Sequence, residues 1–194
     1  MLLRSASLIV AAALLNGPAF AQEAFEIDTE PRVRVDTNMG SFVIELDRIR
    51  APITVEHFLQ YVTEGHYSGT IFHRVVGGFV AQTGGYTRDL ELKPAGRSVF
   101  NESGNGLSNL RGTVGMARSG EPHSGTSQFY INLGDNLDLN PRPTRWGYAV
   151  FGTVVEGMDV VDTIGDKPTG PSGEFDRAVP VEPIEIANIV LLTE

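Results

Sequence analysis

The chain of 194 residues contains no cysteine. Disulfide bonds, thiolate nucleophiles and metal sites with cysteine ligands are therefore excluded. Basic residues are also scarce: 15 lysines and arginines stand against 24 aspartates and glutamates, and the formal net charge is −9. Since binding to phosphate groups requires a basic face, this balance argues against nucleic acids and anionic membranes as partners. An acidic protein that lacks disulfides must be stabilised by its hydrophobic core.

Long hydrophobic runs are absent apart from one near the start of the chain. Arg4 precedes an uninterrupted apolar run, Leu8–Leu15, and the Ala-Phe-Ala sequence at 19–21 is typical of a cleavage site. The apolar run is too short to cross a bilayer, which needs about 20 residues. We therefore predict that residues 1–21 are a cleaved signal peptide and that residues 22–194 form one exported domain.

Motifs of several common enzyme classes are missing as well. The chain has no G-x-S-x-G nucleophile elbow, no P-loop and no G-x-G-x-x-G run, which argues against serine hydrolases and nucleotide enzymes. Its histidines lack the H-x-x-x-H spacing with carboxylate support that is typical of a metal site. We therefore expect no metal and no other cofactor, and we interpret all four histidines as structural or surface residues: His57, His66, His73 and His123.

Short apolar or alternating segments separated by turn residues make up most of the chain. They predict strands at 32–37, 41–46, 70–76, 79–83, 111–117, 128–133, 148–155 and 184–192, with helices at 53–64 and 157–164. The polar stretches 87–109 and 167–173 are predicted to be loops. This pattern indicates a mainly β domain, most simply a closed eight-stranded antiparallel barrel capped by two helices, because closure removes exposed strand edges.

One segment, Phe72–Gly85, places polar groups among apolar residues and glycines (FHRVVGGFVAQTGG). Arg74 and Gln82 lie in two β-like runs joined by a pair of glycines, which tolerate a tight connection. A pocket built here would be apolar with two directed hydrogen-bonding groups. The alternative is that Arg74 is an ordinary solvated residue on a strand face.

A second segment could contribute to the same pocket. Strand alternation places Gln128 and Tyr130 on one face and Phe129 and Ile131 on the other, so that one face can line a site while the other fills the interior. Three residues of the following segment could close this pocket: Leu139, Trp146 and Tyr148.

Four motifs, in this order and spacing, point to one family: FHRVVGGFVAQTGG, RGTVGMARS, GTSQFYIN and GYAVFGTVVEGMDVVD. Over nearly all of residues 33–192 the chain resembles the cyclophilin family of peptidyl-prolyl cis-trans isomerases, and in particular its exported bacterial branch. The resemblance implies an eight-stranded barrel with two helices, a groove on its outer surface and no cofactor. It further implies proline-containing polypeptides as clients and, for the exported branch, the periplasm as location.

The resemblance also implies roles for individual residues. Arg74, Phe79 and Gln82 match the family's catalytic set, in which the arginine donates a hydrogen bond to the proline nitrogen of the twisted peptide bond. The positions that match the family's substrate-binding residues are Val80, Ala117, Arg118, Gln128, Tyr130, Leu139 and Tyr148.

Some positions depart from the better-known eukaryotic members. Asp138 and Leu139 stand where those members have a tryptophan followed by a leucine, and because that tryptophan is associated with cyclosporin binding, we expect weak binding of the drug. Tyr130 replaces a phenylalanine, so its hydroxyl must find a partner or face water. We take a monomer as the default state. The alternative function is a proline-peptide binding module or holdase with little catalysis, and measuring isomerisation separates the two.

Overall fold

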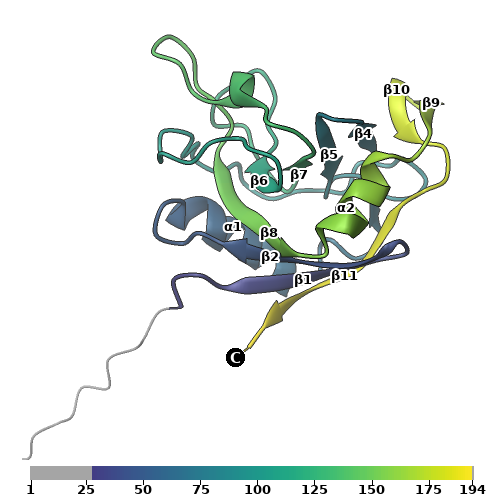
Figure 1. Ribbon diagram of the computed structural model, residues 1–194, viewed down its shortest axis with the longest axis horizontal. Helices are drawn as coiled ribbons and strands as arrows, with labels where there is room; N and C mark the ends of the chain where they lie inside the picture. The colour runs from purple at the N-terminus through teal and green to yellow at the C-terminus, as the bar shows by residue number, and fades with distance from the viewer. Residues whose placement is uncertain (1–27, 194) are drawn as a thin grey trace, which may run out of the picture.

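The computed structural model describes residues 28–193, so the predicted signal peptide lies outside the described part. One antiparallel sheet of nine strands, in the order β3-β11-β1-β2-β8-β6-β7-β5-β4, curls around a hydrophobic core (Figure 1). A separate sheet pairs β9 with β10. The strands are β1 Arg32–Thr37, β2 Gly40–Leu46, β3 Thr70–Ile71, β4 Arg74–Val76, β5 Val80–Thr83, β6 Thr113–Met116, β7 Phe129–Asn132, β8 Val150–Glu156, β9 Thr169–Ser172, β10 Phe175–Pro180 and β11 Glu185–Leu192.

The first hairpin shows how the sequence pattern builds this sheet. Val33 and Val35 on β1 are fully buried, whereas Arg34 between them is exposed. The chain reverses between β1 and β2 at Asn38 and Met39, and Gly40, the first residue of β2, has a φ of +123° that residues with a side chain rarely adopt. Val35 then lies opposite Phe42 across the ladder. The predicted hairpin is confirmed.

The closed eight-stranded barrel that the sequence predicted is not what the structure shows. In the described part, the end strands β3 and β4 share no hydrogen-bonded ladder, and Phe72 and His73 join them along the chain. The predicted strand 70–76 is split because Thr70–Ile71 pairs with β11 whereas Arg74–Val76 pairs with β5. The fold is therefore a mainly β, curled half-barrel of nine strands.

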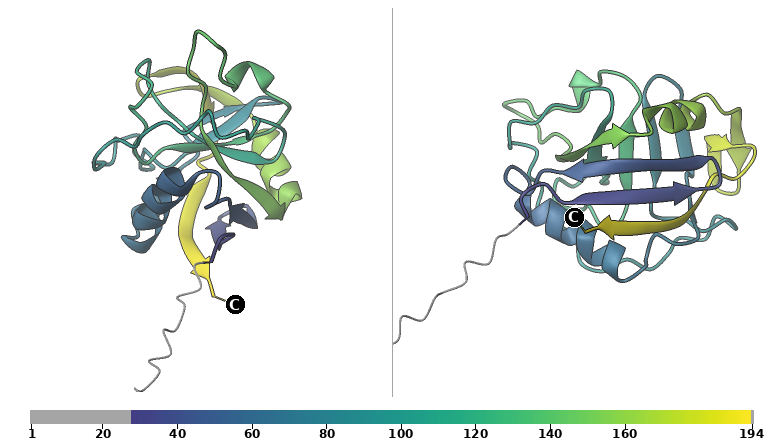
Figure 2. Two further views of the ribbon diagram at one scale, coloured as in Figure 1. Left: turned by 90° about the vertical axis from the view of Figure 1, so that its left-hand side faces the viewer. Right: turned by 60° about the horizontal axis from the view of Figure 1, so that its bottom comes forward.

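Helix α1 (Pro52–Thr63) packs against β11 and covers one side of the curled sheet (Figure 2). It begins at Pro52, whose fixed φ suits the first turn of a helix. Its Phe58 is fully buried, with its ring centroid 5.3 Å from that of Phe129 on β7 and 5.2 Å from that of Phe151 on β8. The predicted first helix is confirmed to within one residue at each end, and its apolar face fills the interior of the half-barrel.

Helix α2 (Met158–Gly165) confirms the second predicted helix and packs against β2, β4 and β5. The chain then forms the β9–β10 hairpin beside β4 (Figure 1), where the sequence predicted only a loop at 167–173. The prediction was wrong because pairing with β10 imposes an extended conformation on a Gly- and Pro-containing segment of low strand propensity. No helix in the described part of the chain is long and apolar enough to cross a membrane.

The long segment 87–109 has no helix or named strand, as predicted. Two asparagine side chains attach it to the rest of the fold. Asn101 Nδ2 donates a hydrogen bond of 3.0 Å to the carbonyl of Gly147, and Asn105 Nδ2 donates one of 2.9 Å to the carbonyl of Val150. These side-chain hydrogen bonds hold the segment near the start of β8, and isolated bridges pair Thr87 with Thr70 and Val99 with Gly125.

Candidate active site

Three adjacent strands place the predicted polar and aromatic residues in one row. Arg74 on β4 lies opposite Gln82 on β5, and Gln82 lies opposite Tyr130 on β7. Tyr130 in turn lies opposite Gly115 on β6, where a Cβ atom would be only 2.3 Å from the ring of Tyr130. The β4–β5 connection turns at Gly78, which has a φ of +69°. The glycine on β6 thus provides the space that the tyrosine ring occupies.

The row lines a cavity of about 280 Å³, which we call the groove. All but one of the predicted site residues line it: Arg74, Phe79, Val80, Gln82, Ala117, Arg118, Tyr130, Leu139 and Tyr148. The exception is Gln128, which contacts the groove through a hydrogen bond with Gln82. The structure therefore brings the residues of four separate motifs to one place.

A chain of polar side chains runs along one side of the groove. Gln82 Nε2 donates a hydrogen bond of 2.9 Å to Gln128 Oε1, and Arg74 Nη1 lies 3.4 Å from Gln82 Oε1. The Arg74 guanidinium also lies over the ring of Phe79, 5.7 Å from its centroid. The pKa of Arg74 is lowered by partial burial and then by the positive charge of Arg177, yet a guanidinium remains charged at any physiological pH. Arg74 therefore presents a fixed cation with unused donors to the groove.

The opposite side of the groove is apolar and separate from the core of the half-barrel. Val80, Ala117 and Tyr130 form a buried cluster, against which the half-buried rings of Phe79 and Tyr148 pack. Phe129 and Ile131, the neighbours of Tyr130 along β7, belong instead to the main core. Tyr130 therefore faces the groove while Phe129 and Ile131 face the core, as strand alternation predicted.

The Tyr130 hydroxyl has a partner that the sequence did not reveal. It donates a hydrogen bond of 2.6 Å to Asn109 Oδ1, at the end of the long segment 87–109. Asn109 Nδ2 donates in turn to Asn140 Oδ1 at 3.0 Å. Burial raises the pKa of Tyr130, so the phenol stays neutral. The only sequence signal for Asn109 was the need of a buried tyrosine for a hydrogen-bond acceptor.

Arg118 forms the rim of the groove above Tyr148. Its guanidinium carbon lies 4.4 Å from the centroid of the Tyr148 ring. Its nitrogens donate to backbone carbonyls, at 3.1 Å to Gly147, 2.9 Å to Trp146 and 2.9 Å to Ser119. The neutral carbonyls fix the position of this cation and leave its charge uncompensated.

Trp146, which the sequence suggested could close the groove, lies outside it. Its side chain is exposed and contacts two other rings, with centroids 4.9 Å away in His123 and 6.0 Å away in Phe100. The prediction was wrong because the irregular segment around Trp146 has no strand alternation from which its direction could be read. Leu139 and Tyr148, predicted together with it, do line the groove.

His73 lies next to Arg74 and is almost completely buried, with 2% of its surface exposed. Its ring centroid lies 4.6 Å from that of Tyr86 and 5.8 Å from that of Phe175 on β10. Nδ1 has no hydrogen-bond partner among residues 28–193. Burial lowers the pKa of His73 to about 4, so the ring is neutral near pH 7. The structural role predicted for this histidine agrees with its surroundings.

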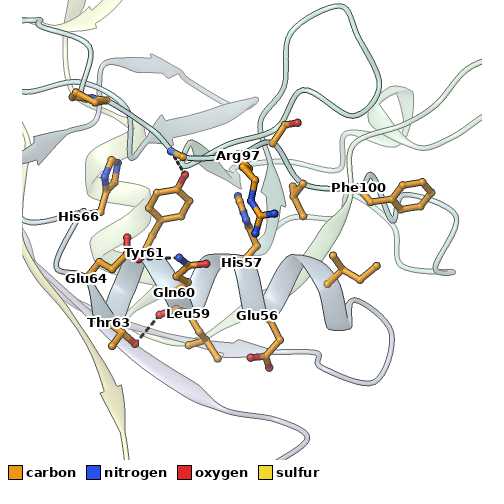
Figure 3. A pocket seen from close by; sticks show the side chains of 15 residues that line it. Glu56, His57, Leu59, Gln60, Tyr61, Thr63, Glu64, His66, Arg97 and Phe100 are labelled. Carbon is orange, nitrogen blue, oxygen red and sulfur yellow. Dashed lines mark hydrogen bonds between the residues drawn. The ribbon is translucent and has the colours of Figure 1, made fainter.

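A larger cavity, of about 900 Å³, lies elsewhere, between α1 and residues 94–100 (Figure 3). It contains His57 and His66, whose Nε2 atoms lie 2.9 and 3.3 Å from backbone carbonyl oxygens. Burial lowers the pKa of both histidines. No group of three metal-ligating side chains occurs here or anywhere else among residues 28–193. We call this cavity the α1 cleft.

Comparison with known proteins identifies the family. The family model described as cyclophilin type peptidyl-prolyl cis-trans isomerase/CLD matches residues 32–190. A peptidyl-prolyl cis-trans isomerase of Streptomyces antibioticus is 50% identical over 163 residues, covering 82% of this chain and 98% of the relative. Peptidyl-prolyl cis-trans isomerase B of Escherichia coli is 46% identical over 162 residues, with the same coverage of 82% and 98%. The chain therefore belongs to the cyclophilin-type peptidyl-prolyl cis-trans isomerases, as its motifs indicated.

A solved structure supports the same assignment. The cyclophilin type peptidyl-prolyl cis-trans isomerase of Cryptosporidium parvum, crystallised in the presence of the dipeptide Ala-Pro, has a TM-score of 0.68 and 28% sequence identity. The match covers 84% of this chain and 99% of that one. The cyclophilin-like fold and the enzyme class predicted from the sequence are thus confirmed.

Proposed function

We propose that this protein accelerates rotation about X-Pro peptide bonds in exported polypeptides, and that it does so in the periplasm after removal of residues 1–21. Its family and the bacterial relatives support the reaction. The signal-peptide pattern supports the location. The observation that carries the mechanism is the placement of Arg74, a fixed cation with unused donors, beside a buried apolar pocket.

The chemistry requires no nucleophile. Rotation about an X-Pro bond has a barrier of roughly 18–20 kcal/mol because the planar amide is stabilised by resonance. At the top of the barrier the resonance is lost, and the proline nitrogen becomes pyramidal and more basic. A donor that bonds this nitrogen stabilises the twisted state more than the planar one and therefore increases the rate.

Arg74 suits this task because its guanidinium is permanently charged and offers several donors in one plane. Only one long contact, 3.4 Å to Gln82, occupies it within the groove. Gln82 is held in turn by Gln128, so its carbonyl oxygen keeps a fixed direction. We assign Arg74 the donor to the proline nitrogen, and Gln82 the hydrogen bonds that hold the substrate backbone.

The apolar side of the groove grips the proline ring. Val80 and Tyr130 form its buried floor, and Phe79, Leu139 and Tyr148 pack against them. A ring anchored on such a surface stays in place while the preceding carbonyl swings. Ala117 and Arg118 also line the groove, and we assign them the contacts with the substrate backbone.

The test is the exchange rate between cis and trans forms of a short X-Pro peptide, measured by NMR with the mature chain and with Arg74→Ala. We expect acceleration by the wild type and about a hundredfold loss in the variant, since each ~1.4 kcal/mol of lost stabilisation is worth tenfold in rate. Unchanged turnover in a folded variant would remove Arg74 from this role. Binding of the peptide without any acceleration would favour the alternative, a proline-peptide binding module.

Cyclosporin binding and assembly complete the proposal. Asp138, which takes the place of the family's tryptophan, has a side chain that is 93% exposed and forms an ion pair with Arg142. This position therefore offers a solvated carboxylate instead of an aromatic surface, and we propose weak binding of the drug to a monomeric protein. Isothermal titration and light scattering test the two statements, and nanomolar affinity or a stable dimer would contradict them.

A further inference from the structure

Most arginines in the described part of the chain form an ion pair with a carboxylate, namely Arg32, Arg34, Arg48, Arg50, Arg88, Arg111 and Arg142. This is expected of a protein with 24 acidic and 15 basic residues, in which a carboxylate is seldom far away. Five arginines have no carboxylate oxygen of residues 28–193 within 4.0 Å: Arg74, Arg97, Arg118, Arg145 and Arg177.

Three of these five lie at or beside the groove. Arg74 and Arg118 line it. Arg177 belongs to β10, which packs next to β4, and its positive charge adds to burial in lowering the pKa of Arg74. The hairpin that the sequence did not predict thus adds a cation beside β4, the strand that carries Arg74.

The carboxylates of the same region do not line the groove and form no ion pair with these three arginines. Glu174, on the turn of the hairpin, accepts a hydrogen bond of 3.3 Å from the Tyr86 hydroxyl. Asp138 is paired with Arg142 outside the groove. Asp176 is exposed and forms no ion pair with any other described residue. The groove therefore contains two cations, Arg74 and Arg118, and no carboxylate among its lining residues, while Arg177 repels Arg74 from the neighbouring strand. A bound anion would relieve this excess of positive charge.

We propose that Arg74, Arg118 and Arg177 form a cationic rim that selects proline segments with acidic residues on either side of the proline. The inference rests on the proposed function, because it describes the substrates of the same groove. Arg118 is rigid, since the carbonyls of residues 119, 146 and 147 hold its guanidinium. Arg177 is exposed and acts over a longer range, as an electrostatic guide for the arriving chain.

The size and salt dependence of the effect follow from solvent exposure. A single exposed charge pair contributes little, and charges farther apart than about 10 Å are screened at 0.1 M salt. Selectivity should therefore be severalfold rather than absolute, and should decrease as salt is added. It should appear mainly in kcat/KM, because the rim acts on encounter and binding.

The experiment compares peptides that differ only in charge. A neutral Ala-Pro core is flanked at two positions by Glu, by its isostere Gln or by Lys, and kcat/KM is measured at about 20 and about 300 mM salt, on either side of the range in which screening sets in. We expect the Glu peptide to be favoured about fivefold over the Gln peptide at low salt, the Lys peptide to be the poorest substrate, and all three to converge at high salt.

The variants locate the effect. Arg177 is exposed, and its side chain forms no hydrogen bonds with the other described residues. Arg177→Ala should lower the ratio of kcat/KM for the Glu peptide to kcat/KM for the Gln peptide about threefold, and Arg177→Glu should bring this ratio to one or below. Arg118→Lys keeps the charge and should keep most of the preference. The matched control is Arg97→Ala, which removes an equally unpaired arginine from the α1 cleft and should leave the ratio unchanged.

Each outcome has one meaning. Catalysis of all three peptides at equal rates would overturn the cationic rim while leaving the proposed function intact. Absence of catalysis with every peptide would overturn the proposed function itself. A charge preference that Arg97→Ala lowers as much as Arg177→Ala does would assign the effect to net charge and not to the rim.

Discussion

The groove and the α1 cleft differ in size and in the state of their polar groups. The cleft encloses about 900 Å³ and the groove about 280 Å³. In the cleft the Tyr61 hydroxyl accepts a hydrogen bond of 2.8 Å from the Gly96 backbone and both histidines contact backbone carbonyls, whereas beside the unpaired Arg97 the described residues form no buried apolar cluster apart from the main core. In the groove, Arg74 keeps unused donors beside a buried apolar cluster. Unused directed groups next to apolar surface, and not volume, distinguish the candidate active site.

A pair of glycines gives the strongest test of this contrast. In Gly115→Ala the new methyl group would lie 2.3 Å from the buried ring of Tyr130, so the ring must move. Overpacking of this kind costs about 3 kcal/mol and should also remove most of the activity. In Gly96→Ala the nearest atom, the Tyr61 hydroxyl of the cleft, is 3.4 Å away, and we expect little change in either property. Urea unfolding measures stability, and cis-trans exchange of a peptide measures activity. Equal effects of the two substitutions would contradict the distinction between the groove and the α1 cleft.

The histidines of the two regions should also contribute differently to the pH dependence of stability. The pKa of His73 is about 4 in the folded protein, against 6.5 for a free histidine, because the ring is buried. As the pH falls below 6.5, the unfolded chain takes up this proton first, so stability decreases until about pH 4 and changes no further on this account. Between about pH 7 and pH 5 the loss should be about 2 kcal/mol.

Denaturant unfolding at several pH values measures this loss. His73→Phe should remove most of the pH dependence in that range. His57 and His66 in the α1 cleft also have a lowered pKa, but they are only half-buried and should contribute less. If the free energy of unfolding of His73→Phe depended on pH as that of the wild type does, the His73 ring would not be the cause of the pH dependence.

The two cavities should also respond differently to conservative changes. Arg74→Lys keeps the positive charge but loses the planar set of donors, so we expect activity to fall about tenfold with the fold intact. The double variant His57→Gln, His66→Gln changes the polar groups of the α1 cleft and should remain within about twofold of the wild type. Equal losses of kcat/KM in the two variants would mean that the cleft takes part in the reaction.

We expect the smallest effect from removing the hydrogen bond between the Tyr130 hydroxyl and Asn109. Tyr130→Phe removes the 2.6 Å bond to Asn109, whose Oδ1 keeps a second donor, Asn132 Nδ2, at 3.2 Å. The acceptor is therefore not left alone, and the free energy of unfolding should fall by only about 1 kcal/mol. Activity should remain close to that of the wild type. A loss of several kcal/mol would mean that the hydroxyl also holds the segment 87–109 in place.

The sequence predicted the groove well because its residues follow simple strand alternation. Arg74 and Gln82 share a face across a tight hairpin, and Tyr130 lies in a strand where site and core residues alternate. Such patterns are local, so they can be read without the fold. The resemblance to the family then indicated candidate substrate-binding residues, and the structure places all of them in the groove except Gln128, which forms a hydrogen bond with Gln82.

Other features depend on partners distant in the chain and could not be predicted. Nothing local separates Thr70–Ile71 from Arg74–Val76, and the split arises only because their partner strands differ. The β9–β10 hairpin and the direction of Trp146 likewise depend on tertiary contacts. Asn109 is one of many polar residues in a long loop, and only the position of Tyr130 singles it out.

The pairing of β1 with β11 also decides when the protein can fold. β1 lies between β2 and β11, and Val33 and Val35 on β1 lie opposite Leu191 and Ile189 near the other end of the chain. Until β11 has been synthesised, one edge of β1 has no partner, so the native sheet cannot assemble on a partly made chain. Contacts so far apart in sequence also make folding slow. A chain that stays unfolded until its last strand is made can still be threaded through a membrane channel, as the proposed export requires.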